Sequence, residues 1–158
     1  MKVHDMSLLR NASYIAGAWQ ETGAGSLAVT NPATGESIAE IVTAGREQTE
    51  AAIAAAHDAM QSWQEVPAKA RAQVLRRWFD LMMAHQEDLA IIMTIEQGKA
   101  LAESRGEVAY GAAFMEWFGE QAKRIDGDVI PAPSSDKRVL CIKQPCLLYT
   151  SPSPRDRG

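Results

Sequence analysis

Two cysteines are the strongest nucleophiles in this sequence, so their surroundings are the first test for a reaction centre. Cys141 lies between Leu140 and Ile142 in a short apolar run. A reactive cysteine forms its thiolate beside a helix N-terminus or a basic group, whereas this run predicts a strand. We therefore expect an inert packing role for Cys141 and no chemical role for Cys146. Two cysteines do not make a disulfide framework, so both are expected to be reduced thiols.

Carboxylates and histidines could supply acid–base or metal chemistry, but their spacing favours neither. Glu103 and Glu107 are four residues apart in a helical pattern, and Glu116 and Glu120 repeat this spacing. Paired carboxylates can exchange protons with a substrate. With basic residues nearby in the sequence, however, these pairs are typical of a solvated helix face. The histidines are too scattered for a metal cluster at ligand spacing: His4, His57 and His85.

An aromatic cluster lies on the same helical pattern. Tyr110, Phe114 and Trp117 are spaced i, i+4 and i+7, which places their rings on one face of a helix. Such a face either packs into the protein core or forms the wall of a ligand site. The spacing leaves both interpretations open, and ordinary core packing is the simpler one.

The elements that must position these side chains begin with strands. Residues 14–19 form an apolar run with a glycine break and predict a short strand. Residues 27–30 and 37–42 predict two more strands. Between them an Asn-Pro pair favours a turn, and Gly35 can adopt the positive φ that closes it. The pattern predicts an N-terminal β-hairpin or short meander.

Four helices are predicted after the strands, because apolar residues recur at helical spacing. Gly45 is an acceptable N-cap of the first helix, Pro67 suits the first turn of the second, and Gly98 can close the third. The expected ranges are residues 47–63, 67–85, 87–97 and 101–125. In the first helix, Ile53, Ala56, Met60 and Trp63 are predicted to share one face. In the second helix, the residues expected to face inward are Val74, Leu75, Trp78, Phe79 and Met82.

The end of the chain changes character twice. Residues 129–131 and 138–143 predict two strands, the second basic at both ends as an edge strand often is. Residues 146–158 carry prolines at alternate positions, which removes backbone donors, and we interpret them as a non-native or disordered tail. Residues 1–13 are expected to be a flexible N-terminus. The predicted fold class is α+β and mostly helical, with a β-hairpin, about four helices and a strand pair.

Composition argues against several classes of function. The chain has 158 residues, enough for one domain with a core, and 46% of them are hydrophobic. Its net charge of −4, without a basic stripe, gives no electrostatic reason to expect nucleic acid as a partner. No apolar run approaches the roughly 18–20 residues of a membrane span, and no signal peptide is recognised. We expect a cytoplasmic protein that binds neither nucleic acid nor membrane.

Four short motifs resemble one enzyme family. They are TNPATGE at residues 30–36, EQGK at residues 96–99, FMEWF at residues 114–118 and KQP at residues 143–145. Together they make residues 14–145 similar to the N-terminal part of an aldehyde dehydrogenase, and most similar to succinate-semialdehyde dehydrogenases. The resemblance implies a larger α/β parent enzyme. This chain would contribute its β-hairpin, a helical layer beside the cofactor domain and the first strands of an oligomerisation arm.

The resemblance also implies the reaction of that parent. Members of the family oxidise a small-molecule aldehyde with NAD(P)+ through a cysteine thioester, which requires an activated cysteine, a glutamate base, an oxyanion donor and a cofactor loop. The family places all of these beyond residue 145, and this sequence contains no G-x-G-x-x-G loop. For the parent we expect NAD(P), succinate semialdehyde as substrate and a homo-oligomeric state. For this chain we expect no catalytic residue, no cofactor and no activity.

Two sets of residues acquire expected roles from the resemblance. Tyr110, Phe114 and Trp117 would help to wall the aldehyde tunnel of the parent. A structural monovalent cation would be held by oxygen atoms just before the Asn-Pro turn and near the EQGK motif. The matching residues here are Val29, Thr30 and Glu96, the last standing where relatives often have Asp.

A second hypothesis is a small helical interaction module without catalysis. The two hypotheses predict different sequences downstream of Lys143 in the source gene. A continuation that encodes a cofactor loop, a catalytic cysteine and a base glutamate would indicate the enzyme, and a stop codon would indicate the module. Under the enzyme hypothesis, apolar stripes such as residues 78–79 and 110–117 lack the sheet that they pack against in the parent. We then expect this chain to be marginally stable and prone to self-association.

Overall fold

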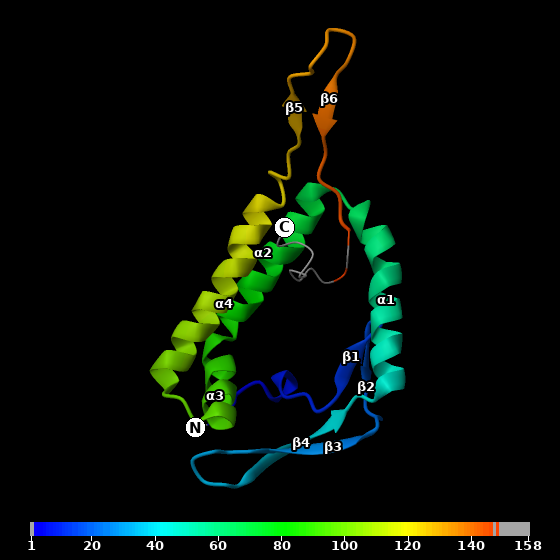
Figure 1. The fold of residues 1–158 in the computed structure, drawn as a ribbon. Helices are drawn as coiled ribbons and strands as arrows, with labels where there is room; N and C mark the ends of the chain where they lie inside the picture. Colours follow the sequence, from blue (N-terminus) through cyan, green and yellow to red (C-terminus); the bar gives the residue numbers. More distant parts are fainter. Residues whose placement is uncertain (1, 147, 149–158) are drawn as a thin grey trace.

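Four helices dominate the fold and are joined to three two-stranded sheets in the part of the chain that the structure describes (Figure 1). The computed structural model describes residues 2–146 and residue 148. The helices are α1 (Arg46–Gln64), α2 (Ala68–Ala84), α3 (Gln86–Gln97) and α4 (Leu101–Gln121), after a 3₁₀ turn, η1 (Met6–Leu8). The strands are β1 (Ser13–Ile15), β2 (Ala18–Gln20), β3 (Gly25–Thr30), β4 (Ser37–Thr43), β5 (Asp128–Ile130) and β6 (Val139–Cys141). The predicted class, α+β and mostly helical, is confirmed.

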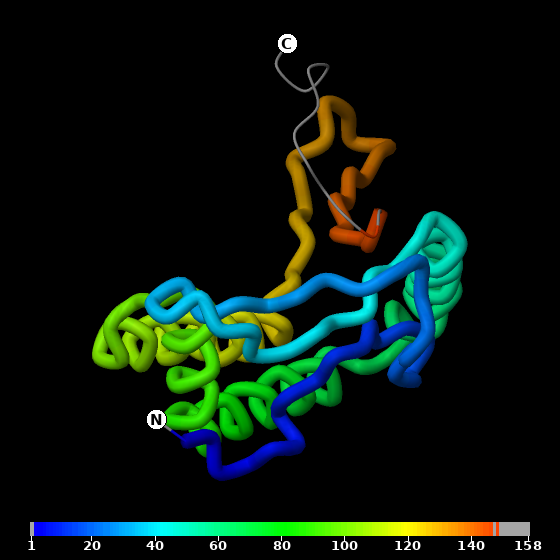
Figure 2. The backbone as a smooth tube through the Cα atoms, turned by 90° about the horizontal axis from the view of Figure 1, so that it is seen from below, coloured from blue at the N-terminus to red at the C-terminus, as the bar shows by residue number. Residues whose placement is uncertain are grey.

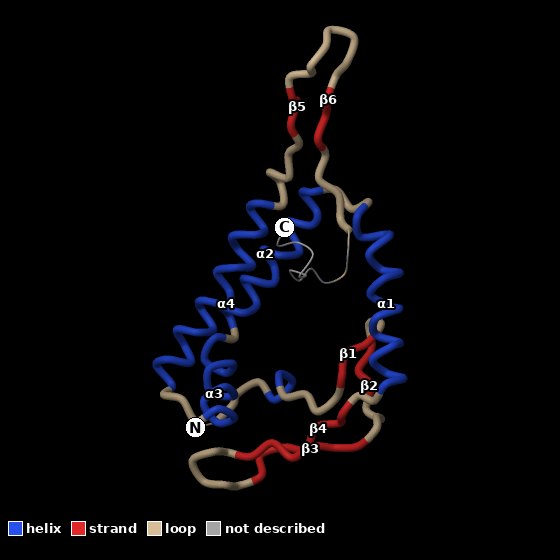
Figure 3. The backbone as a smooth tube through the Cα atoms, viewed as in Figure 1, coloured by secondary structure: helices blue, strands red, loops and turns tan. Residues whose placement is uncertain are grey.

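The first two sheets are antiparallel hairpins close to the N-terminus (Figure 3). The single strand predicted at residues 14–19 is instead a tight hairpin, in which Tyr14 of β1 lies opposite Trp19 of β2. Its turn consists of Ala16 and Gly17, at φ of 52° and 83°, the positive values that such turns require. The hairpin of β3 and β4 is confirmed, and Gly35 in its turn has a φ of 76°.

The core lies where α2, α3 and α4 pack together, and we call these three helices the helical unit. Gly119 lies against Leu75 and Gly111 lies against Met82, so α4 runs antiparallel to α2. The two helices are side by side in both views (Figures 1 and 2). The buried apolar residues of this region are small or aliphatic, so the helix axes can approach closely: Ala72, Ala90, Ile91, Val108, Ala112 and Ala122.

The connection between α3 and α4 follows its local signals. α3 ends at Gly98, as predicted, with a φ of 76° and with its N–H donating to the carbonyl of Thr94 at 2.9 Å. Further along, the hydroxyl oxygens of Thr94 and Ser104 are 2.8 Å apart in a buried hydrogen bond. Both buried hydroxyls are thereby satisfied. No helix among the described residues is long and apolar enough to cross a bilayer.

α1 lies apart from the helical unit in both views (Figures 1 and 2). Its predicted N-cap, Gly45, is confirmed, and the Gly45 amide donates to Oε1 of Gln48 at 3.0 Å. The helix buries none of its residues. Ile53 and Trp63, which are predicted to share one face of this helix, are 57% and 46% exposed. An apolar stripe shows which face of a helix requires a packing partner, but it does not show whether that face is buried.

α2 also differs from the prediction in the direction of its apolar face. Leu75 and Phe79 are half-buried, but Val74 and Trp78, predicted to face inward with them, are exposed. The contact with α4 uses only one side of the helix, so the rest of the predicted face meets solvent. Two boundaries are also corrected: Pro67 precedes α2 as its N-cap residue, and α4 ends at Gln121 rather than at residue 125.

The last described element is the hairpin of β5 and β6, which projects beyond the end of α4 (Figure 1). The predicted strand pair is confirmed, but all its strand residues are exposed. The packing role expected for Cys141 is therefore wrong, because this thiol lies on the surface. The expectation of a non-native or disordered tail at residues 146–158 falls almost wholly outside the described residues. The flexibility expected of residues 1–13 stays a prediction.

Candidate functional site

The aromatic residues of α4 form the first candidate site. Tyr110, Phe114 and Trp117 line one hollow of about 380 Å³ together with Ala113 and Phe118. The rings of Tyr110 and Phe114 meet edge to face, with their centroids 4.9 Å apart. All three predicted rings are exposed, Tyr110 by 67% and Trp117 by 59%. Core packing within this chain is therefore excluded for them, and their role as a tunnel wall stays a prediction.

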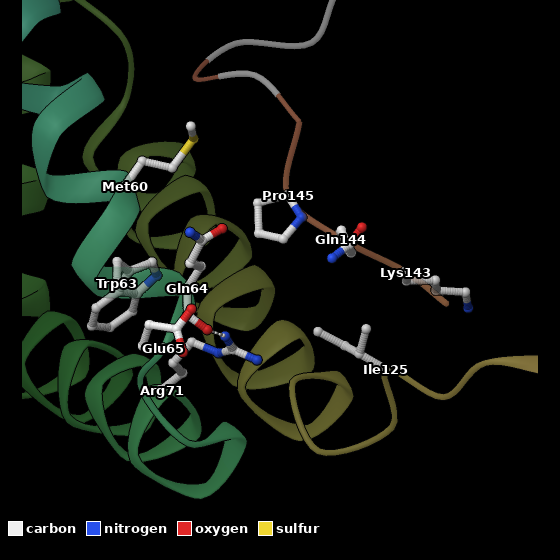
Figure 4. Close-up of a pocket in the computed structure, with 9 residues that line it drawn as sticks. All are labelled: Met60, Trp63, Gln64, Glu65, Arg71, Ile125, Lys143, Gln144 and Pro145. Carbon is white, nitrogen blue, oxygen red and sulfur yellow. Dashed lines mark hydrogen bonds between the residues drawn. The ribbon is translucent and has the colours of Figure 1, made fainter. Parts of the chain in front are cut away.

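A second, larger groove of about 600 Å³ lies where the chain runs on from β6 (Figure 4). α1 contributes Met60 and Trp63 to it, and residues 143–145 form another of its sides. At its base Arg71 donates from Nη1 to the backbone carbonyl of Gln64 at 3.3 Å, which ties the end of α1 to the start of α2. The groove is thus lined by three segments that are distant in sequence: residues 60–71, Ile125 and residues 143–145.

The predicted cation ligands come from two segments that the structure brings together. The turn after β3 lies against the end of α3, where a Cβ added to Gly98 would be 2.8 Å from Cγ of Pro32. Thr30 precedes this turn, and Glu96 belongs to the last turn of α3. The β3–β4 register also shifts between Val29 and Thr30, an irregularity that releases backbone groups from pairing. Oxygen atoms from these two segments would suit a hard cation, and the ligand roles of Val29, Thr30 and Glu96 stay predictions.

Two of the paired carboxylates of α4 form ion pairs with basic side chains on the surface. Glu107 forms an ion pair with Lys99, and Oε1 of Glu116 is 3.2 Å from Nη1 of Arg76 on α2. The prediction of a solvated helix face is confirmed for these two residues, and their ion pairs with Lys99 and Arg76 are an additional finding. The Arg76–Glu116 pair bridges the two antiparallel helices, and its two side chains are 57% and 41% exposed. Such exposed pairs contribute little to stability.

Sequence reasoning missed the charged residues at the start of α3. Oε2 and Oε1 of Glu87 accept from Nε and Nη2 of Arg105 at 2.7 and 2.8 Å, and this hydrogen-bonded pair lowers the pKa of Glu87 and raises that of Arg105. Asp88 is only 7% exposed and accepts from the backbone amides of His4 and Asp5 at 2.8 and 2.9 Å. These two amides lower the pKa of the Asp88 carboxyl. A carboxylate in a first helical turn is a visible signal, but its distant partners are not.

The described residues contain no group of three or more His, Cys, Asp or Glu side chains that could hold a metal ion. Cys141 and Cys146 are both exposed. The described part of the chain thus presents exposed apolar surfaces on a helical scaffold.

Comparison with known proteins places this scaffold in a family. The sequence profile of the aldehyde dehydrogenase family matches residues 19–149. A glutarate-semialdehyde dehydrogenase of Pseudomonas aeruginosa is 53% identical over 155 residues, which are 98% of this chain and 32% of that protein. A succinate-semialdehyde dehydrogenase (NADP+) of Escherichia coli is 49% identical over the same shares. The chain thus spans about a third of the length of these curated relatives.

Solved structures of longer chains contain the same arrangement of elements. A crystal structure of an NADP-dependent enzyme from E. coli matches with a TM-score of 0.89 at 48% identity, over 91% of this chain and 30% of the other. The succinate-semialdehyde dehydrogenase of Burkholderia pseudomallei gives a TM-score of 0.85 at 48% identity, over 89% and 29% of the two chains. The resemblance suggested by the four motifs is confirmed. Because the profile match takes in most of the sequence, this chain belongs to the aldehyde dehydrogenase family.

Proposed function

We propose that this chain is the N-terminal scaffold of an enzyme that oxidises a semialdehyde to the corresponding dicarboxylic acid. In the reaction, the aldehyde, water and NAD(P)+ give the acid, NAD(P)H and a proton. A cysteine of the remaining protein would form the thioester, and the nicotinamide cofactor would accept the hydride. The residues of this chain would bind neither the thioester nor the nicotinamide cofactor. Their role would be to present the helical unit and the hairpins to the domains that bind them.

The observation that carries the proposal is the identity to semialdehyde dehydrogenases. Relatives named for glutarate semialdehyde and succinate semialdehyde are 53% and 49% identical to this chain, and one named for 3-sulfolactaldehyde is 47% identical. All three named aldehydes carry an anionic group at the other end. We therefore propose a short aldehyde with a carboxylate tail as substrate, with succinate semialdehyde as the first choice and glutarate semialdehyde as the second. We also propose a cytoplasmic, homo-oligomeric parent enzyme.

A chimera tests this proposal. Residues 2–145 of this chain are joined to the part of the P. aeruginosa relative that lies beyond the position aligned with Pro145. We expect the chimera to reduce NAD+ or NADP+ with succinate or glutarate semialdehyde, with kcat/KM values close to those of the intact relative. An inactive chimera that folds and assembles like the intact relative would contradict the proposal.

The 158-residue chain alone is the matched control, and we expect it to show no turnover with either cofactor. Both of its cysteines are exposed, and Cys141 lies in a β-strand rather than at a helix N-terminus. Turnover that survives repurification and disappears in Cys141→Ser would instead assign the reaction to this chain.

We also propose that oxygen atoms of Val29, Thr30 and Glu96 help to hold a monovalent cation in the parent enzyme. The contact between Pro32 and Gly98 supports it by joining the two segments. In the chimera, replacing potassium or sodium chloride with tetramethylammonium chloride should lower the melting temperature, and Glu96→Gln should reduce that difference. Equal melting temperatures in all three salts would rule the cation out.

A further inference from the structure

α4 is apolar on two opposite sides, and only one of them has a partner among the described residues. The inner side, with Val108, Ala112 and Gly119, is buried against the other helices of the helical unit. The outer side carries four aromatic residues, which we call the aromatic face: Tyr110, Phe114, Trp117 and Phe118, exposed by 67%, 42%, 59% and 54%. A helix with apolar residues on two opposite sides requires a partner for each of them. Four adjacent exposed rings therefore mark a surface for a partner.

The aromatic face continues into the groove beside residues 143–145. Phe118 lines a hollow with Trp63, Ile125 and Lys143, and the larger groove is lined by Trp63, Ile125 and the same stretch up to Pro145 (Figure 4). The polypeptide therefore passes the end of the aromatic face as it leaves β6. In the relatives, about two-thirds of the protein lies outside the part that this chain matches. A continuation of that size would begin beside this apolar surface.

We propose that the aromatic face and the adjoining Trp63 groove are a docking surface for the C-terminal two-thirds of an aldehyde dehydrogenase, and that they bind it even when it is a separate polypeptide. This inference rests on the proposed function for the identity of the partner. It goes further because it requires that this surface binds the C-terminal part without a peptide bond between the two polypeptides. Burial of several aromatic rings supplies the driving force.

The experiment co-expresses this chain with a tagged polypeptide made from the part of the P. aeruginosa relative that lies beyond the position aligned with Pro145. We expect the two chains to co-purify at equal stoichiometry and the tryptophan emission to shift to the blue in the complex, because Trp63 and Trp117 would lose their exposure to water. Tyr110→Gln should weaken the complex about tenfold, the loss expected for one aromatic ring removed from a buried contact. The double variant Phe114→Gln/Trp117→Gln should abolish co-purification.

Tyr14→Gln is the matched control. Tyr14 is 62% exposed and packs edge to face on Trp19 at 5.1 Å, much as Tyr110 packs on Phe114. It lies in the hairpin of β1 and β2, away from α4, so affinity should change less than about twofold. Equal losses in Tyr14→Gln and Tyr110→Gln would overturn the assignment of the surface.

Two further outcomes separate the inference from its rivals. If the wild-type chain forms a dimer that Tyr110→Gln dissociates, and the dimer excludes the tagged polypeptide, the occupant is a second copy and the proposal fails. If the chimera is active but the separate chains do not associate, the proposed function stands and the docking inference alone is lost. Circular dichroism of each variant before mixing establishes that the helical unit is still folded.

Discussion

α1 and α4 are helices of similar length, 19 and 21 residues, but they differ in what they bury. α1 carries a regular apolar stripe and buries nothing, whereas α4 buries one of its two apolar sides against α2 and α3. α4 packs on α2 and on α3, whereas α1 has its main contact with the short strand β1. Helical periodicity thus reports which face requires a partner, and tertiary packing decides how much of that face is covered.

The largest expected difference between the two helices is in their protection from hydrogen exchange. The buried side of α4 ties its amides to the opening of the whole helical unit, while α1 can open alone. We expect amides in the middle of α4, near Ala112, to exchange at least about a hundredfold more slowly than those near Ala55 of α1. Mass spectrometry or NMR exchange on the 158-residue chain measures this ratio, and equal rates would remove the basis of the comparison.

The close approach of α4 to α2 can be broken at one glycine. A Cβ on Gly119 would lie 3.3 Å from Cβ of Leu75, whereas one on Gly106, in the same helix, would meet open space. Gly119→Leu should therefore lower the free energy of unfolding by about 2–3 kcal/mol through overpacking. Gly106→Leu should raise it by about 0.5–1 kcal/mol through helix propensity. Urea titration compares the two, and a stabilising Gly119→Leu would mean that the helices are not packed as described.

A smaller effect is expected where α3 meets the turn after β3. Gly98 and Gly35 have the same φ of 76°, but a Cβ would clash with Pro32 only at Gly98. Each change to Ala should cost about 1–2 kcal/mol for the left-handed backbone. Gly98→Ala should cost about 1 kcal/mol more, for overpacking against Pro32. If thermal unfolding shows equal losses, the turn is not docked on α3 in solution.

The smallest effect concerns the contact between the N-terminal segment and Asp88. Because the His4 and Asp5 amides lower the folded-state pKa of Asp88, its contribution is present above the ordinary aspartate pKa of about 3.9 and is lost as the pH falls below it. Acid should therefore lower the protection of these two amides, measured as their exchange rate relative to the intrinsic rate at each pH. Asp88→Asn should remove most of this pH dependence, and Asp58→Asn on exposed α1 should leave it unchanged.

Much of the fold follows from signals that are local in the sequence. Gly45, Gly98 and Gly35 set a helix start, a helix end and a turn, and each acts through its own backbone and its immediate neighbours. The helices themselves follow from apolar spacing, which extends over a few turns. These features could be predicted because no distant residue is needed to produce them.

The features that could not be predicted depend on distant residues. Asp88 accepts from amides 84 and 83 residues away, and Arg76 pairs with a glutamate 40 residues further along. The exposure of Trp63 and Trp78 depends on which partner is present, and their spacing is the same with or without one. For the candidate site, the spacing of Tyr110, Phe114 and Trp117 predicted that the rings share a face, but not whether that face is covered.

The order of α2, α3 and α4 along the chain also has a consequence for biosynthesis. The three helices are consecutive and end at Gln121, so the helical unit can form on the ribosome before the rest of a full-length relative has been made. Translation at about 5–20 residues per second would take on the order of tens of seconds to complete the remaining two-thirds. Throughout that interval we expect the nascent chain to display an uncovered aromatic surface, of the exposed hydrophobic kind that chaperones bind during synthesis.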